Sequence, residues 1–332
     1  MTGLIVACQQ GPAETEENNT QKQDSTVTSK APTAMDSINR LVANDPLNPR
    51  KLAIRAKVYL SASNMKAARN DINKAFSIDS NVAMVREARG ELNFMMNKGR
   101  AAQKDWEACI RIEPENSDCL MKLGELYIAV QNYERALEMV NRQLKINDKD
   151  AQAYFMKGII IRDDYNDTAL ALQYFQNAVD LKQDYIDALD MLGVTLANRG
   201  DSLAPYYYKR ILEYQPSRYD IYYKMGAYYM SQNEENRALE AFTNAVQINP
   251  AHAESYYSMG YIQLQLRQFA QARDLFTKSI NARQRNYKAY YGRGYSFEML
   301  GDIINAKKDY QKALEILPMY TPAREALQRI NE

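Results

Sequence analysis

The sequence is poor in the residues that most often carry catalysis. Its 332 residues include one histidine, His252, together with three cysteines and one tryptophan. It contains no glycine-rich phosphate-binding motif, no CxxC pair and no HExxH motif. No residue near His252 in the sequence would complete a catalytic triad or a metal site with it. We therefore expect no catalytic residues, no cofactor and no metal, and we predict that the protein is not an enzyme.

The sequence also contains little glycine and has almost no net charge. Glycine numbers only 13, and no segment alternates apolar and polar residues as a strand does. Long stretches of Ala, Leu, Glu, Lys, Gln and Arg favour helix instead. The 42 basic residues are matched by 41 acidic ones, without a polybasic cluster, so nothing favours a nucleic acid as partner. Tyrosine, by contrast, is abundant, with 25 copies.

The chain repeats itself with a period of 34 residues. The clearest copy is 219–252, with Gly226 at position 8 of the unit, Ala238 at position 20, Phe242 at position 24 and Pro250 at position 32. Steps along the chain in both directions find the same landmarks in eight units: 49–82, 83–116, 117–150, 151–185, 186–218, 219–252, 253–286 and 287–320. Unit 151–185 has one extra residue, and unit 186–218 has one fewer.

This pattern resembles the tetratricopeptide repeat over about four-fifths of the chain. The resemblance implies an all-α fold, a right-handed α-solenoid of about eight antiparallel helix pairs, A then B. Small residues at positions 8, 20 and 27 let the helices approach closely, and larger ones at positions 4, 7, 11 and 24 fill the space between them. Residues 34–46 align with a lone N-terminal helix B, and residues 321–332 predict a polar capping helix.

The N-terminal stretch GLIVACQQ, residues 3–10, resembles the end of a bacterial lipoprotein signal of the Bacteroidetes type. Residues 1–8 would then be the remnant of a signal ending at Cys8, the site of lipid attachment, and the polar residues 9–33 a disordered tether. Only seven residues precede Cys8, so we do not expect an intact signal in this sequence. The alternative is an ordinary tail that contains a cysteine. No other segment is apolar enough to span a bilayer, so membrane attachment would depend on lipid alone.

Two other cysteines lie ten residues apart. Cys109 occupies the small position 27 of its unit, and Cys119 lies at position 3 of the next. They are either two small buried side chains or, in an oxidising compartment, a disulfide across the junction between one helix B and the next helix A.

The resemblance also predicts a binding groove. In tetratricopeptide arrays, positions 5 and 9 of helix A line a concave surface that holds partners. Here these positions predict the partner-binding residues Tyr223, Tyr257, Tyr261, Tyr291 and Tyr295, with Phe155 in the middle units and Glu87, Glu91 and Glu125 nearer the N-terminus. Tyrosine suits such a surface because it offers a large rigid ring and a polar tip. The tyrosines at position 5 could instead serve packing.

These features predict a non-enzymatic interaction scaffold, anchored by lipid in the bacterial cell envelope and holding a protein or peptide. Its expected location is the outer membrane, facing the periplasm or the cell surface. The alternative is a soluble cytoplasmic adaptor. Chaperone-binding relatives hold a carboxylate with basic residues at positions 5 and 9, but only Lys57 is basic there, so such a partner is not expected. Self-association through the aromatic groove is also open.

Overall fold

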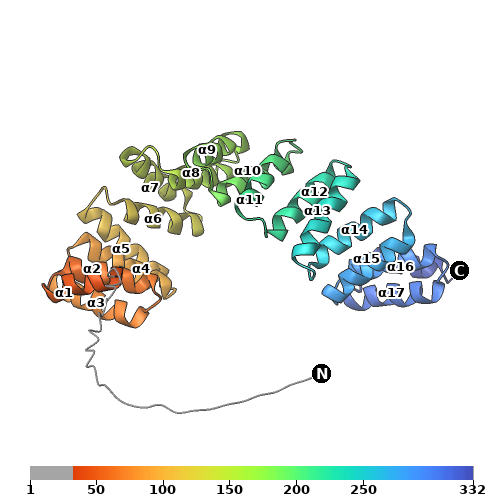
Figure 1. Ribbon diagram of the computed structural model, residues 1–332, viewed down its shortest axis with the longest axis horizontal. Helices are drawn as coiled ribbons and strands as arrows, with labels where there is room; N and C mark the ends of the chain where they lie inside the picture. Colours follow the sequence, from red (N-terminus) through yellow and green to blue (C-terminus); the bar gives the residue numbers. More distant parts are fainter. Residues whose placement is uncertain (1–32, 332) are drawn as a thin grey trace, which may run out of the picture.

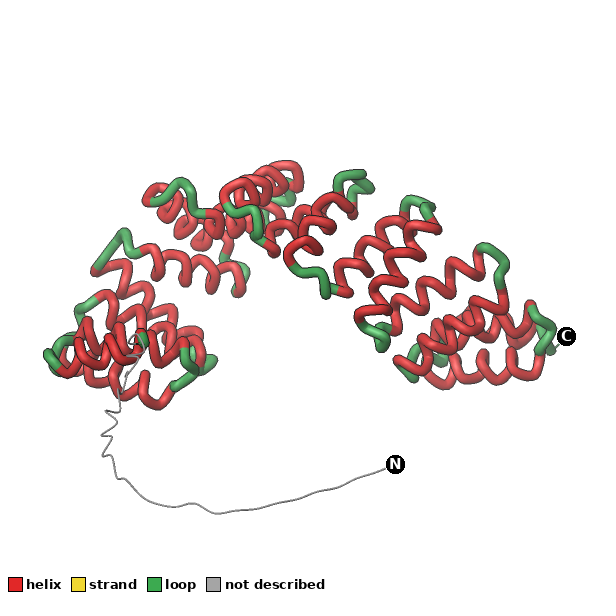
Figure 2. Tube along the Cα trace, viewed as in Figure 1, coloured by secondary structure: helices red, strands yellow, loops and turns green. Residues whose placement is uncertain are grey.

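The computed structural model describes residues 33–331, and this part of the chain forms eighteen α-helices and no strand. The helices pair and stack into an elongated array that bends into an arch, as Figures 1 and 2 show. The predicted all-α solenoid is therefore confirmed. The predicted lipid site Cys8 and most of the predicted tether lie outside the described residues. None of the described helices is both long enough and apolar enough to cross a membrane.

Each of the eight units consists of two helices. The A helices are α2 (Pro49–Ser61), α4 (Ala83–Met95), α6 (Ser117–Ala129), α8 (Ala151–Asp163), α10 (Ile186–Asn198), α12 (Tyr219–Ser231), α14 (Ala253–Gln265) and α16 (Tyr287–Met299). The B helices are α3 (Met65–Ile78), α5 (Gly99–Ile112), α7 (Tyr133–Ile146), α9 (Thr168–Leu181), α11 (Ala204–Tyr214), α13 (Glu235–Ile248), α15 (Phe269–Ala282) and α17 (Ile303–Ile316). Every A helix begins at the first residue of a unit. Helix α1 (Ala34–Ala43) precedes the array, and α18 (Thr321–Arg329) follows it.

A single left-handed residue reverses the chain between helix A and helix B of each unit. These residues are Ser63, Asn97, Gln131, Asn166, Gly200, Asn233, Arg267 and Gly301, all with positive φ. In several units a polar residue of the same turn then caps helix B; Asn64 Oδ1, for example, accepts a hydrogen bond from the Ala67 amide. The two units of irregular length depart from the others after helix A. The extra residue of unit 151–185 lies in this turn, whereas α11 has 11 residues and α13, for comparison, has 14.

The glycine at position 8 brings helix A against an aromatic ring of helix B. A Cβ added at Gly226 would lie 2.6 Å from the ring of Phe242. Phe276 is held from two sides, because a Cβ at Gly260 of its own unit or at Gly292 of the next would come within 3.0 Å of its ring. These rings are fully buried. Close packing thus compensates for the cost of glycine inside a helix, about 1 kcal/mol relative to alanine.

We expect Gly292→Ala to lower stability although alanine is the better helix former. Its Cβ would lie 2.5 Å from the buried Phe276 ring, and overpacking of this kind costs about 1–3 kcal/mol. Gly99→Ala is the matched control, because no atom lies within 4 Å of its added Cβ. Thermal unfolding followed by circular dichroism should show a lower Tm for the first variant only. Equal Tm values for both variants would contradict the packing role of Gly292.

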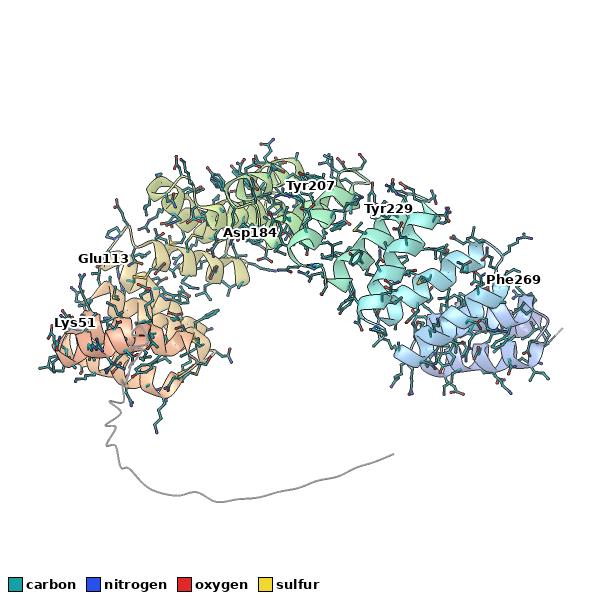
Figure 3. The ribbon with its side chains drawn as sticks, in the orientation of Figure 1. Lys51, Glu113, Asp184, Tyr207, Tyr229 and Phe269 are labelled. Carbon is teal, nitrogen blue, oxygen red and sulfur yellow. A yellow bond between two sulfur atoms is a disulfide. The ribbon has the colours of Figure 1, made fainter. Side chains whose placement is uncertain are left out.

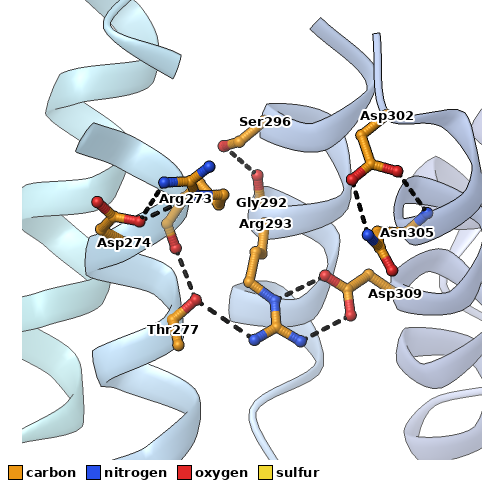
Figure 4. Close-up of polar contacts among 9 residues, drawn as sticks. All are labelled: Arg273, Asp274, Thr277, Gly292, Arg293, Ser296, Asp302, Asn305 and Asp309. Carbon is orange, nitrogen blue, oxygen red and sulfur yellow. Dashed lines mark hydrogen bonds and ion pairs between the residues drawn. The ribbon is translucent and has the colours of Figure 1, made fainter. Parts of the chain in front are cut away.

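Buried ion pairs join helices A and B in three units, and the sequence analysis missed them. Arginine at position 7 pairs with aspartate at position 23 in Arg55–Asp71, Arg89–Asp105 and Arg293–Asp309. In the last pair, Nε and Nη2 of Arg293 donate to the two carboxylate oxygens of Asp309 at 2.7 and 2.8 Å (Figure 4). Nη1 also reaches Thr277 Oγ1 of the preceding unit, at 3.4 Å. The expectation that position 7 only fills space was therefore incomplete.

Asp309→Ala should destabilise the protein by about 3 kcal/mol or more, because it leaves the largely buried Arg293 guanidinium without its counter-ion. Glu315→Ala on the same helix removes only the exposed pair with Lys312 and should cost about 0–1 kcal/mol. Denaturant unfolding of both variants measures the difference. Similar losses would mean that the Arg293–Asp309 pair contributes no more than a surface contact.

The two buried cysteines form a disulfide. Cys109 at the end of α5 and Cys119 in α6 are bonded, with their Cα atoms 6.4 Å apart. Of the two interpretations that the sequence left open, the structure shows the covalent one. The bond ties unit 83–116 to unit 117–150 at the junction of their helices.

Candidate partner-binding groove on the A-helix face

Two adjoining hollows lie between the A helices of the C-terminal units. The first, of about 720 Å³, lies between α10 and α12, beside the short helix α11, and the second, of about 490 Å³, extends from α12 across α14 to the start of α16. Tyr223 lines both hollows. The two hollows therefore adjoin at this residue, and we call them together the A-helix groove. Among its lining residues are Val194, Ala197, Arg199, Tyr223, Lys224, Ala227, Glu254, Tyr257, Ser258, Arg283, Arg285, Tyr287 and Lys288.

The predicted aromatic residues at position 5 all occur in the same packing arrangement. Each ring lies 5.6–5.8 Å from the aromatic ring at position 24 of its own helix B: the pairs are Phe155–Phe175, Tyr223–Phe242, Tyr257–Phe276 and Tyr291–Tyr310. All four position-5 side chains are half-buried. They therefore contribute to packing, and the two tyrosines that line the groove, Tyr223 and Tyr257, also present ring surface there.

Burial also determines the ionisation of these phenols. It raises the pKa of Tyr223, Tyr257 and Tyr291 above the ordinary tyrosine value. The hydroxyls consequently stay protonated at neutral pH. Each can donate a hydrogen bond to a partner as well as accept one.

The tyrosines at position 9 are more open. Tyr261 is 43% exposed, one helical turn beyond Tyr257 on α14. Tyr295 is half-buried and meets Phe269, labelled in Figure 3, edge to face at 6.5 Å. Neither residue lines the two hollows, so both lie beyond them on the same helix face. Tyr261 is the more accessible of the two to a partner.

The predicted acidic end of the groove needs a correction at Glu87. Its side chain is only 7% exposed and is paired with Lys57, which also reaches Asp118 at 3.2 Å. Burial raises the pKa of Glu87 against the opposing effect of Lys57. The expectation of an accessible Glu87 was wrong because position 5 lies deeper than position 9, as the buried Ala53 at another position 5 also shows.

The other two predicted glutamates are more accessible than Glu87. Glu91 is half-buried, and Glu125 is exposed and accepts a hydrogen bond from Gln152 at 2.5 Å. Both lie in units far from the two hollows along the chain. The structure therefore does not bring the predicted glutamates and tyrosines together in one site.

The groove contains residues that the sequence analysis missed. Tyr287, at position 1, lines the second hollow. Its ring meets edge to face, at 4.9 Å, that of Tyr320, the residue before α18, which does not line the hollow itself and whose pKa burial raises to about 12. Arg283 and Arg285 come from the connection between α15 and α16, and Lys288 from the first turn of α16. The sequence analysis missed these residues because it considered only positions 5 and 9 of helix A and not the connections between units.

His252 serves the fold. It is the N-cap of α14, where its Nδ1 accepts a hydrogen bond from the Ser255 amide at 3.3 Å, and its ring lies 5.0 Å from that of Tyr223. Burial lowers its pKa, so the ring is neutral at pH 7. Residues 33–331 hold no group of three or more His, Cys, Asp or Glu side chains placed to bind a metal.

Sequence comparison bears directly on the repeat. Models of the tetratricopeptide repeat match residues 94–157, 219–252 and 257–319. Three separate segments of the chain therefore match this repeat. The match over 219–252 coincides with the helix pair α12 and α13, whereas the other two extend over parts of neighbouring units.

Similarity to known proteins is partial. Human RNA polymerase II-associated protein 3 is 25% identical over 143 residues, 37% of this chain and 22% of that protein. The Protein CTR9 homolog of Arabidopsis thaliana is 28% identical over 89 residues, 27% of this chain and 8% of that protein. The chain thus spans less than a quarter of the length of either relative.

Two solved structures are similar to parts of the chain, each with a TM-score below 0.5. MamA 41-end from Desulfovibrio magneticus RS-1 has a TM-score of 0.46 at 18% identity, covering 51% of this chain and 96% of that one. YrrB, described as a TPR protein with an unusual peptide-binding site, has a TM-score of 0.37 at 18% identity, covering 67% and 97%.

Proposed function

We propose that this protein is a non-enzymatic scaffold that holds an extended segment of a protein partner in the A-helix groove. The observation that carries the proposal is the shared wall of the two hollows at Tyr223. Two open hollows that adjoin and together extend over four repeats suit an elongated segment better than a compact small molecule. Protein binding is also the general role of arrays built from this repeat.

The lining of the groove supports the same conclusion. Tyr223, Tyr257 and Tyr287 present rings whose positions are held by packing against neighbouring aromatic residues. A partner that covers them buries apolar surface at little cost in side-chain entropy, while the tyrosine hydroxyls pair with its backbone. Tyrosines held in this way are typical of surfaces that contribute strongly to binding.

We further propose that the protein works in the bacterial cell envelope, held there by lipid on Cys8. The sequence around Cys8 supports the anchor, and the disulfide between Cys109 and Cys119 supports the compartment. Disulfides persist in oxidising compartments and are rare in the cytosol, where thiols are kept reduced. The cytoplasmic adaptor is the less favoured alternative on this ground.

Site-directed photo-crosslinking tests the groove. Photoreactive benzoylphenylalanine replaces either Tyr261 on α14 or Tyr206 on α11, which are exposed to similar extents, 43% and 54%. Because the first lies on the A-helix face and the second on a B helix, we expect partner adducts in cells from position 261 and not from 206. Mass spectrometry then identifies the adducts.

Each other outcome has a definite meaning. Adducts from position 206 alone would place binding on the B-helix face. The same adduct from both positions would mean that the partner does not bind the A-helix face in preference to the B-helix face. An adduct formed from two copies of this chain would identify self-association in place of a separate partner.

Fractionation tests the location. The chain is expressed behind a complete lipoprotein signal sequence, as wild type and as Cys8→Ser. We expect the wild type in the membrane fraction and Cys8→Ser in the soluble fraction. Thiol trapping should find Cys109 and Cys119 oxidised in both, because export does not depend on the lipid. Membrane association that survives in Cys8→Ser, or reduced cysteines in the wild type, would contradict the proposed anchor or compartment.

A further inference from the structure

Two cations of the A-helix groove have no acidic partner within residues 33–331. Arg285 and Lys288, both exposed, line the hollow of about 490 Å³, and neither forms an ion pair with any carboxylate of residues 33–331. Their neighbour Arg283 differs, since it pairs with Glu254 at 2.5 Å. The charged lining therefore comprises three cations and one carboxylate, a surplus of two positive charges.

The residues on the other side of Arg285 do not supply a carboxylate to pair with it. Arg285 also lines a neighbouring hollow of about 470 Å³, together with Lys312 and Glu315. The Glu315 carboxylate there already forms an ion pair with Lys312, whose Nζ lies 2.6 Å from it. Arg285 thus stands between two hollows without a counter-ion in either. The surplus is local, since the whole chain carries a net charge of only +1.

Hydrogen-bond donors accompany these cations. Tyr257 and Tyr287 line the same hollow. Burial raises the pKa of Tyr257, so its hydroxyl stays protonated and available as a donor. Guanidinium, ammonium and phenol groups together form a donor-rich surface that matches carboxylate oxygens. The rings beside them can cover the backbone or an apolar side chain of the same ligand.

We propose that this hollow binds an acidic segment of a polypeptide partner, with its carboxylates at Arg285 and Lys288 and its adjoining residues against Tyr257 and Tyr287. The proposal rests on the scaffold function above and names the chemistry of its ligand. A nucleic acid fits less well, because its affinity depends on many phosphate contacts and the hollow offers a surplus of only two charges.

Peptide titration of the full-length protein tests this directly. The probes are fluorescein-labelled hexaglutamate and hexaglutamine peptides, followed by fluorescence anisotropy. We expect hexaglutamate to bind about tenfold more tightly than hexaglutamine at low salt, and this preference to shrink at high salt because exposed charges are screened. Arg285→Ala/Lys288→Ala should weaken hexaglutamate binding about fivefold to tenfold.

The control removes the same charge elsewhere. Lys66 and Lys74 on α3 are also exposed, so Lys66→Ala/Lys74→Ala should leave the affinity within about twofold of wild type. Circular dichroism verifies that both double variants are folded. Equal binding of the two peptides, or equal weakening by the two double variants, would overturn the proposal. Tighter binding of a labelled oligothymidylate than of hexaglutamate would assign the hollow to nucleic acid instead.

The two proposals can fail separately. If partner adducts at position 261 persist in Arg285→Ala/Lys288→Ala while hexaglutamate does not bind the wild type, the groove holds its partner without acidic recognition. If adducts form at position 206 and not at position 261, the groove itself is not the binding surface, whatever the peptides do.

Discussion

The contact between the glycine at position 8 of helix A and the aromatic ring at position 24 of helix B underlies most of this structure. Gly158 faces Phe175, Gly226 faces Phe242 and Gly294 faces Tyr310, each so closely that a Cβ would lie within 3.0 Å of the ring. The ring lies against helix backbone, and this sets how near the two helices come. Position 5, less than one turn earlier on helix A, then reaches the same ring. An aromatic side chain at position 5 packs against this ring and stays half-buried.

This arrangement connects stability to recognition. The position-5 tyrosines are part of the packing of each unit, and their exposed edges cost little entropy to bury under a partner because the rings are already ordered. At Tyr223 and Tyr257, packing is thus compatible with the proposed binding role. A side chain at position 9, such as Tyr261, lacks such support and is more exposed, so it contributes contact area with less pre-organisation.

Departures from the regular repeat give the array its individual features. Helix α11 is shorter than the other B helices of the array, and the larger hollow of the groove lies beside it. The connection before α16 contains Arg283 and Arg285 and contributes cations to the second hollow. Charge is therefore distributed unevenly along the A-helix face. Glu125 is exposed in an N-terminal unit, whereas Arg285 and Lys288 lie near the C-terminal end.

The sequence by itself determined the helix pairs and where each unit begins, because the spacing of glycine, alanine, aromatic residues and proline is a local property of the chain. It also identified the position-5 tyrosines as groove candidates. Only the tertiary structure decided that Glu87 is buried, that Cys109 and Cys119 are bonded, and that Arg293 pairs with Asp309. The same holds for the meeting of Arg285 and Lys288 with Tyr257. These outcomes depend on distances between different helices and neighbouring units, and a repeat pattern read along one chain does not contain those distances.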